Sequence, residues 1–412
     1  MKVRRLDMTS FRGFRELTLE FTEPVTVLVG VNGAGKTSIL DCLAVLLAQL
    51  PSEILSLKKL GRRLYESDVH TGAPHTQNTV EVDMDGRVVT WSLALVRRGS
   101  PRQVTNQLTE LKGLVESTRW WDSDRLPLAI YYPVNRAVAV AGSSRANPRQ
   151  HRFFDFEPLD AFVEALEEGG RDFRLFFEWF RAREDLENER RLQMDSAYRD
   201  PQLEAVRTAI TRLVPGFSKL RVQRAPLRML LQKGDTTLEV DQLSDGEKSL
   251  LAMAGDIGRR LAIANPKLPD PLSAEAVVLI DEIELHLHPG WQRMVVEQLQ
   301  KTFPNCQFIL TTHSPQVLSQ VPARSVILLD QFQRAELPAG TLGRDSNAIL
   351  TEIMGVTERP QATADHIHEI ARMIDREELL AAREALDALA RQLGEQDSEV
   401  VRLRSLIGFL GG

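Results

Sequence analysis

The sequence predicts an α/β protein with a mixed central sheet, flanking helices and a helical C-terminal part, and three observations carry this prediction. A β-rich apolar run at residues 25–29 leads into a glycine-rich loop and then a helical pattern. Short, mainly apolar runs recur at 128–132, 276–280 and 307–311, as expected of strands buried on both faces. Residues 346–410 then show helical spacing almost without interruption.

An antiparallel sheet is expected near the N-terminus. Residues 3–8 and 17–21 alternate apolar with polar side chains, which is the pattern of half-buried strands. Residues 78–84 and 87–93 show strand character and are joined at Asp85–Gly86, a dipeptide that favours the tight turn of a β-hairpin. These segments predict an N-terminal antiparallel β-subdomain beside the central sheet.

The loop after residue 29 matches the phosphate-binding pattern GxxxxGK[ST], with Gly30 first and Thr37 last. Its glycines let backbone N–H groups face a phosphate, and the start of the following helix adds partial positive charge. Lys36 is expected to reach the β- and γ-phosphates of ATP, and Thr37 to hold Mg²⁺. We expect Pro51 to end this helix. The predicted nucleotide-binding residues are Asn32, Gly33, Ala34, Gly35, Lys36, Thr37 and Ser38.

Two acids follow the apolar strand at residues 276–280. Asp281 stands where a second magnesium ligand is needed, and Glu282 where a base can polarise the attacking water. His313 follows the next buried strand and can donate a hydrogen bond to a γ-phosphate without carrying a permanent charge. His286 and His288 lack a cysteine or a spare aspartate nearby, so we interpret them as structural residues rather than metal ligands.

Residues 244–247, Ser-Asp-Gly-Glu, precede a further helical pattern. A serine and a glycine at a helix start can bind an anion, which makes Ser244, Asp245, Gly246 and Glu247 candidate nucleotide ligands. Ser244 and Glu247 also have the spacing of a capping box. Both interpretations can hold together.

Composition favours a soluble cytoplasmic protein without a membrane segment. Of 412 residues, 43% are hydrophobic and 26% charged, and no signal-peptide core follows the basic N-terminus. Two distant cysteines, Cys42 and Cys306, exclude a disulfide scaffold or a structural zinc site. Because the net charge is −6, nucleic-acid binding would need a local basic patch. Arg145, Arg149 and Arg152 form such a cluster, which is also typical of a solvated loop.

Taken together and in this order, the four motifs at residues 30–38, 243–253, 277–289 and 309–315 resemble the ABC-type ATPase heads of the RecF, SMC and overcoming-lysogenisation-defect group. The resemblance covers most of residues 1–330. Phe11-Arg12-Gly13-Phe14 is similar to the N-terminal signature of that group, which implies that Arg12 approaches a nucleotide phosphate. Three further segments resemble ATP-binding proteins related to the ATPase of Septu antiphage systems and of certain retrons, namely residues 131–136, the helix at 176–187 and the C-terminal helices.

The resemblance implies that ATP binds between two copies of the chain. One copy would supply the phosphate loop, Asp281, Glu282 and His313, and the other Ser244, Asp245 and Gly246, so that ATP favours a closed homodimer or higher homo-oligomer. The Q-loop glutamine of ABC proteins has no obvious counterpart, and Asn135 or Arg136 is our candidate for it. The implied division is an N-terminal lobe (1–135), a loop and helical insertion (136–220), a C-terminal lobe (221–335) and a helical appendage (336–412).

The motifs leave three functions open. The favoured hypothesis is an ATP-hydrolysing sensor or regulator of a partner effector, such as an HNH nuclease, in prokaryotic antiphage defence. The alternative is a RecF-like repair ATPase that binds DNA, and nucleic acid is therefore left open as a partner. A transporter subunit is disfavoured because transporter heads run shorter and lack the FRGF opening. The insertion is too short for a long coiled coil, and the C-terminal acids lack the arrangement of a Toprim nuclease.

Overall fold

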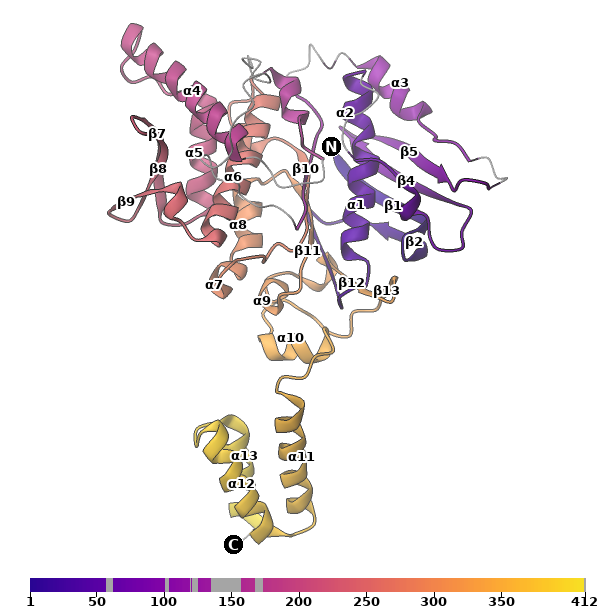
Figure 1. The fold of residues 1–412 in the computed structure, drawn as a ribbon, viewed down its shortest axis with the longest axis vertical. Helices are drawn as coiled ribbons and strands as arrows, with labels where there is room; N and C mark the ends of the chain where they lie inside the picture. The colour runs from indigo at the N-terminus through magenta and orange to yellow at the C-terminus, as the bar shows by residue number, and fades with distance from the viewer. Residues whose placement is uncertain are drawn as a thin grey trace. The chain divides into compact units, whose positions relative to one another are not determined.

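A computed structural model of the chain divides it into two compact units, Met1–Asp345 and Ser346–Gly412, which are described separately (Figure 1). The structure describes residues 1–56, 62–100, 104–118, 120, 125–134, 157–166 and 173–410. The Q-loop candidates Asn135 and Arg136 lie outside these residues. So does the predicted basic cluster of Arg145, Arg149 and Arg152.

The first unit opens with a four-stranded antiparallel sheet in the order β2-β1-β4-β5. Its strands are β1 (Lys2–Phe11), β2 (Phe14–Glu20), β4 (His75–Met84) and β5 (Arg87–Val96). Met84 pairs with Arg87 across Asp85 and Gly86, which both have positive φ, so the predicted hairpin is confirmed. The indole N–H of Trp91 donates to the backbone oxygen of Leu46 over 2.8 Å and ties the sheet to helix α1 (Lys36–Leu47).

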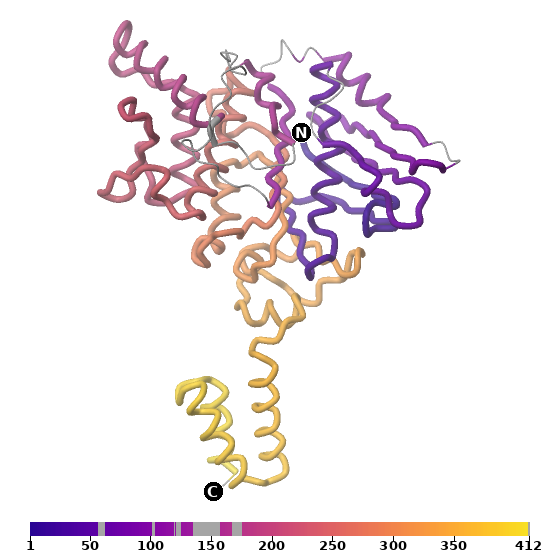
Figure 2. The backbone as a smooth tube through the Cα atoms, viewed as in Figure 1, coloured from indigo at the N-terminus to yellow at the C-terminus, as the bar shows by residue number. Residues whose placement is uncertain are grey.

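The central sheet has six strands in the order β13-β12-β3-β11-β10-β6. Strands β3 (Val25–Gly30), β6 (Leu128–Tyr132), β10 (Ala276–Ile280), β11 (Gln307–Thr311) and β12 (Val326–Asp330) run parallel, and β13 (Gln333–Ala335) is antiparallel. Strand β3 pairs with β11, so segments far apart in sequence lie side by side (Figure 2). The carboxyl ends of β3, β10 and β11 therefore meet at one edge, where ligands bind in open parallel sheets.

The prediction that Pro51 ends the first helix is wrong. Helix α1 is followed directly by α2 (Gln49–Ile54), and Pro51 is the third residue of α2. A proline is tolerated there because the first N–H groups of a helix have no intrahelical acceptor. The stretch Lys36–Ile54 has the length and mean hydropathy of a membrane span, but 72% of its most apolar window is buried inside the protein, as in a core helix.

Helices and a small sheet flank the central sheet on the side away from the antiparallel sheet (Figure 1). The helices are α4 (Phe173–Gln193), α5 (Pro201–Leu213), α6 (Asp245–Ala264), α7 (Pro289–Gln292), α8 (Val295–Thr302) and α9 (Pro315–Leu318). Helix α3 (Thr109–Ser117) packs instead on β5 of the antiparallel sheet. The three-stranded sheet consists of β7 (Phe217–Arg224), β8 (Leu227–Lys233) and β9 (Thr236–Glu239). A side chain at Gly255 would lie 2.7 Å from the Phe176 ring, so the small residues of α6 let α4 pack closely.

Single 3₁₀ turns connect several elements. They are η1 (Glu66–Asp68), η3 (Pro158–Phe162), η4 (Val240–Gln242), η5 (Pro271–Ser273) and η6 (Ala323–Ser325). With the three sheets, the flanking helices and the helical second unit, the predicted α/β fold class is confirmed.

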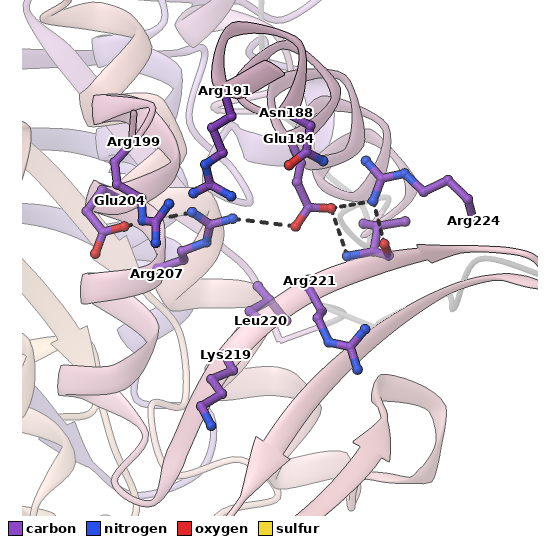
Figure 3. Close-up of a pocket in the computed structure, with 11 residues that line it drawn as sticks. Glu184, Asn188, Arg191, Arg199, Glu204, Arg207, Lys219, Leu220, Arg221 and Arg224 are labelled. Atoms are coloured by element: carbon purple, nitrogen blue, oxygen red, sulfur yellow. Dashed lines mark hydrogen bonds and ion pairs between the residues drawn. The ribbon is translucent and has the colours of Figure 1, made fainter. Parts of the chain in front are cut away.

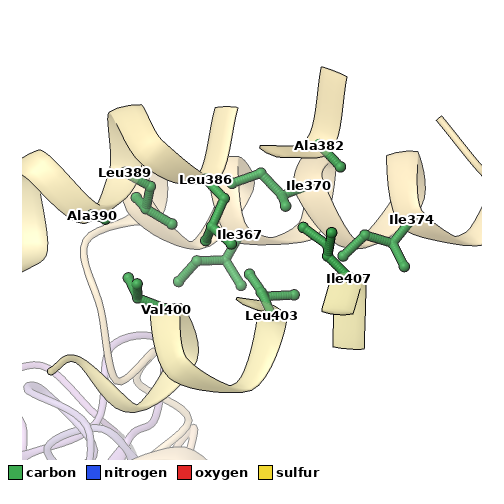
Figure 4. Close-up of a cluster of buried hydrophobic side chains, with 10 residues drawn as sticks. All are labelled: Ile367, Ile370, Ile374, Ala382, Leu386, Leu389, Ala390, Val400, Leu403 and Ile407. Carbon is green, nitrogen blue, oxygen red and sulfur yellow. The ribbon is translucent and has the colours of Figure 1, made fainter. Parts of the chain in front are cut away.

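The second unit is helical and has a core of its own. It contains α10 (Ser346–Glu352), α11 (Gln361–Asp375), α12 (Leu379–Leu393) and α13 (Ser398–Leu410). Aliphatic side chains such as Ile370, Leu386 and Leu403 point toward one another between the last three helices (Figure 4). Arg359 donates two hydrogen bonds of 3.0 Å to the carboxylate of Asp397, which fixes the start of α11 beside the start of α13.

Candidate active site

A cavity of about 650 Å³ lies at the carboxyl ends of β3, β10 and β11. The structure brings most of the predicted residues into it, from the N-terminal segment, the phosphate loop, the end of β10 and the end of β11. The lining residues are Arg12, Gly13, Asn32, Gly33, Gly35, Lys36, Thr37, Ser38, Asp281, Glu282, His313 and Phe332. Ala34 is buried in the loop and is not among them.

The phosphate loop owes its shape to glycines with positive φ. Gly33 and Gly35 have φ of 82° and 100°, values that side chains with a Cβ rarely adopt. The Nζ of Lys36 donates to the backbone oxygens of Gly30 and Val31 over 2.9 and 3.1 Å. Burial lowers the pKa of Lys36, while the nearby Asp281, Glu282 and Glu284 oppose that shift. Lys36 therefore lies folded against its own loop, facing three carboxylates.

Asp281 is fixed by two threonines. Its Oδ2 accepts a hydrogen bond of 2.8 Å from the Thr37 hydroxyl, and its Oδ1 one of 2.5 Å from the Thr311 hydroxyl. The residue is only 1% exposed, and burial raises its pKa against these two hydrogen bonds. A hydroxyl and a carboxylate in contact at the edge of a phosphate loop are oxygen donors that fit Mg²⁺.

Glu282 adopts a left-handed backbone with φ of 47°. Such a conformation costs on the order of 1–3 kcal/mol for a residue with a Cβ and is common at functional sites. The backbone N–H of Glu282 donates to the Thr311 hydroxyl over 2.7 Å, while that hydroxyl donates to Asp281. Thr311 thus positions both acids. Sequence reasoning missed this residue, although it lies just before the Thr312-His313 pair.

The main chain at His313 is held by Glu284. The carboxylate of Glu284 accepts from the backbone N–H of His313 and from the Thr312 hydroxyl, the latter over 2.8 Å. Burial and then the charge of Lys36 lower the pKa of His313. This shift favours the neutral imidazole, which can donate one hydrogen bond. Sequence reasoning assigned no role to Glu284.

Arg12 lies beside the phosphate loop and is held by two acids. Its guanidinium donates to Asp41 over 2.6 Å and to Asp68 over 2.8 Å, with a longer contact of 3.4 Å to the Ser38 hydroxyl. Asp41 also accepts a 2.8 Å hydrogen bond from the Tyr131 hydroxyl at the end of β6. Sequence reasoning found Arg12 but neither acid, since nothing in the local pattern around Asp41 or Asp68 distinguishes them from surface acids.

Phe332, in the turn between β12 and β13, is another lining residue that the sequence did not reveal. Its ring packs edge-on against Phe14, with centroids 5.3 Å apart at 86°. A side chain at Gly13 would lie 2.0 Å from the Phe332 ring, and one at Gly35 would lie 2.4 Å from Phe14. The FRGF segment, the phosphate loop and this turn therefore pack in direct contact.

We expect Gly13→Ala to destabilise the first unit by roughly 1–3 kcal/mol, because the added methyl must displace an aromatic ring. The Gly13→Ala, Phe332→Ala double variant should lose less than the sum of the two single variants, since the methyl then has room. Gly113→Ala is the control, as its new side chain meets nothing within 4 Å in α3. Thermal unfolding of the wild type and these four variants measures the effects, and simple additivity of the two changes would contradict the proposed contact.

The candidate nucleotide ligands Ser244, Asp245, Gly246 and Glu247 lie at the start of α6, outside this cavity. Ser244 caps the helix: its backbone N–H donates to Glu247 over 2.9 Å, and its hydroxyl accepts from the Glu247 N–H over 3.4 Å. The predicted capping box is therefore confirmed. A side chain at Gly246 would lie 2.4 Å from the backbone oxygen of His286, so this helix start packs on the segment that follows Glu282 and Glu284. Asp245 also begins this helix and does not line the cavity.

The structural interpretation of the two histidines after β10 fits their surroundings. His288 caps α7, and its Nδ1 accepts from the Gly290 N–H over 3.2 Å. His286 has a positive φ of 64° in the turn before it. In the part of the chain that the structure describes, no group of three or more His, Cys, Asp or Glu side chains could hold a metal ion.

Comparisons with known proteins relate the chain to ATPase families. A family model described as "AAA domain" matches residues 5–214, and one described as "AAA domain, putative AbiEii toxin, Type IV TA system" matches residues 129–319. The chain is 29% identical to the "Retron Ec83 probable ATPase" of Escherichia coli, over 98% of this chain and 86% of that protein. It is 24% identical to the "Septu protein PtuA" of Bacillus mycoides, over 81% of this chain and 41% of that protein.

Among solved structures, an SMC head bound to the C-winged helix domain of ScpA matches with a TM-score of 0.47 and 16% identity, over 81% of this chain and 97% of that one. The first AAA model alone spans about half of the chain and includes the phosphate loop. The chain therefore belongs to the AAA domain family, and it is an ATPase.

Proposed function

We propose that two copies of this chain enclose ATP between them, each completing the other's site. The observation that carries this proposal is the division of the predicted residues. The phosphate loop, the two acids and His313 share one cavity, whereas Ser244, Asp245 and Gly246 lie at a helix start that does not line it. A helix start with free N–H groups suits a phosphate presented by a second copy.

Within one copy, each residue of the cavity has a proposed role. Lys36 binds the β- and γ-phosphates, and Arg12 approaches the nucleotide from the side of Ser38. Glu282 polarises the attacking water, and His313 donates a hydrogen bond to the γ-phosphate. Thr37 and Asp281 would hold Mg²⁺, which would supply positive charge beside the phosphates.

The partner copy would bring the start of α6 toward the γ-phosphate. Ser244 and the N–H groups of Asp245 and Gly246 are the proposed contacts, and Glu247 keeps the helix start in shape through its capping box. ATP then favours the closed dimer because it contacts both copies, and hydrolysis removes the shared γ-phosphate.

Ser244→Arg tests the composite site. We expect a monomer of this variant to bind ATP as the wild type does, because residue 244 lies outside the cavity, but its bulk and charge should prevent closure. Ser244→Ala is the control: it also loses the cap, at about 1 kcal/mol, but adds no bulk. Light scattering with a non-hydrolysable ATP analogue reports dimerisation. Nucleotide-driven dimerisation of Ser244→Arg at wild-type concentrations would rule the composite site out.

The further proposal is that this ATPase acts as a sensor or regulator of a partner effector, such as an HNH nuclease, in prokaryotic antiphage defence. It is supported by two relatives: the retron ATPase matches nearly the whole chain, and the Septu protein matches about four-fifths of it. A cytoplasmic location agrees with two buried cysteines, Cys42 and Cys306, that are not disulfide-bonded.

Copurification from the native host, with mass spectrometry, tests the partner. A nuclease or reverse transcriptase that is encoded beside this chain and copurifies with it would support the defence role. A chain encoded among replication genes, whose ATP turnover rises on gapped DNA in a salt-dependent way, would instead indicate the RecF-like alternative.

A further inference from the structure

A second cavity, of about 510 Å³, lies between α4, α5 and β7 (Figure 3). It shares no lining residue with the cavity at the phosphate loop. Six of its lining side chains are cationic and two, Glu184 and Glu204, are acidic. The cations are Arg191, Arg199, Arg207, Lys219, Arg221 and Arg224.

Part of this charge is fixed in place by buried acids. Glu184 and Glu187 of α4 are 6% and 1% exposed. Arg207 donates to Glu187 over 3.0 Å and lies 3.4 Å from Glu184, which also accepts from Arg224. Arg191 pairs with Glu187. These arginines neutralise the acids, and the ion pairs hold their guanidinium groups rigidly at the wall of the cavity.

Lys219 and Arg221 differ from these arginines in their exposure and pairing. Both are exposed, and no hydrogen bond or ion pair with any described residue engages either side chain. They lie at an irregularity of β7, where the pairing with β8 shifts between Ser218 and Arg221 and Lys219 has a φ of 52°. Such a bulge redirects side chains and has a cost of its own. In Figure 3 both side chains extend from β7 away from the ion pairs of α4 and α5.

We propose that this cavity binds a phosphate group, with Lys219 and Arg221 as the main ligands. Guanidinium groups match phosphate oxygens in pairs, and an ammonium adds a point charge. A concave space of this volume suits a small ligand or the end of a strand. The phosphate would come from the end of a nucleic-acid strand or from a free nucleotide. The site is distinct from the ATPase cavity and does not depend on the dimer proposed above.

The test compares Lys219→Ala, Arg221→Ala with a control double variant, Arg212→Ala, Lys301→Ala. The control removes two exposed cations that do not line the cavity. Three probes are used with the full chain: a short 5′-phosphorylated single strand, the same strand without the 5′-phosphate, and pyrophosphate. Fluorescence anisotropy measures binding of the two strands, and calorimetry measures binding of pyrophosphate. We expect the cavity variant to lose affinity by at least about tenfold for one probe, since two charge-assisted contacts are removed, and the control by much less.

The probes also distinguish the source of the phosphate. If the cavity variant loses affinity only for the phosphorylated strand, the ligand is a strand end. Equal loss of affinity for both strands indicates an internal phosphodiester, and loss of affinity confined to pyrophosphate indicates a free phosphate compound. Equal weakening in the cavity and control variants would overturn the proposal, because binding would then follow total charge. Failure of the wild type to bind any of the three probes would overturn it as well. An unchanged melting temperature confirms that both double variants are folded.

Discussion

Lys36→Ala is expected to lower the affinity for ATP by at least about 100-fold. The lysine is 6% exposed and lines the cavity, and three carboxylates influence its charge. Without its charge, the triphosphate would meet Asp281, Glu282 and Glu284 with less compensation. Hydrogen bonds to charged groups contribute about 1.5–3 kcal/mol each, and each 1.4 kcal/mol is about a factor of ten in affinity.

Titration with a fluorescent ATP analogue measures this effect. Lys36→Met keeps most of the aliphatic side chain and separates lost charge from lost packing. Lys301→Ala, which removes an exposed lysine of α8 paired with Glu297, is the matched control and should bind ATP normally. If Lys36→Ala remained folded and bound ATP within about threefold of the wild type, the lysine would not be a phosphate ligand.

The parts of the site that could be predicted are those that local sequence determines. A glycine loop between a buried strand and a helix dictates its own backbone, so Gly35, Lys36 and Thr37 could be placed from the pattern alone. The acids at the end of β10 could be placed in the same way. A short apolar run predicts a buried strand, and Asp281 and Glu282 directly follow it, so both must lie at the edge of the sheet.

The residues that hold these groups could not be predicted, because their contacts join distant segments. Arg12 meets Asp41 and Asp68, which are 29 and 56 positions away, and Thr311 meets Asp281 across 30 positions. Each of these partners is an ordinary polar residue in its local context. Only the pairing of β3 with β11 and of β11 with β10 brings Asp281, Glu282 and the phosphate loop together.

The charged stretch of α4 shows the same limit. In sequence it is a highly charged helical continuation, typical of a solvated face. In the structure Glu184 and Glu187 are buried, because Arg207 of α5 and Arg224 of β7 cover them. Charge content alone therefore did not distinguish a surface helix from a helix that carries a buried ion-pair network.

Glu282→Gln is expected to slow ATP hydrolysis by roughly 10²–10⁴-fold, the usual contribution of a general base. Glutamine has the same shape, so the left-handed backbone and the hydrogen bond from its N–H to Thr311 should persist. Asp281 cannot take over, because both of its oxygens already accept hydrogen bonds from threonine hydroxyls. Affinity for ATP should therefore stay near that of the wild type while turnover falls.

The same variant tests the dimer, because ATP that is bound but not cleaved should keep two copies closed. We expect ATP to shift Glu282→Gln to a lasting dimer in light scattering, whereas the wild type returns to monomer as phosphate is released. Glu297→Gln, an isosteric change on the exposed face of α8, should behave as wild type. A normal rate of phosphate release would remove Glu282 from the chemistry. If phosphate release slowed and the affinity for ATP fell by the same factor, this glutamate would have a role in binding. A base that acts only in the transition state leaves ground-state affinity unchanged.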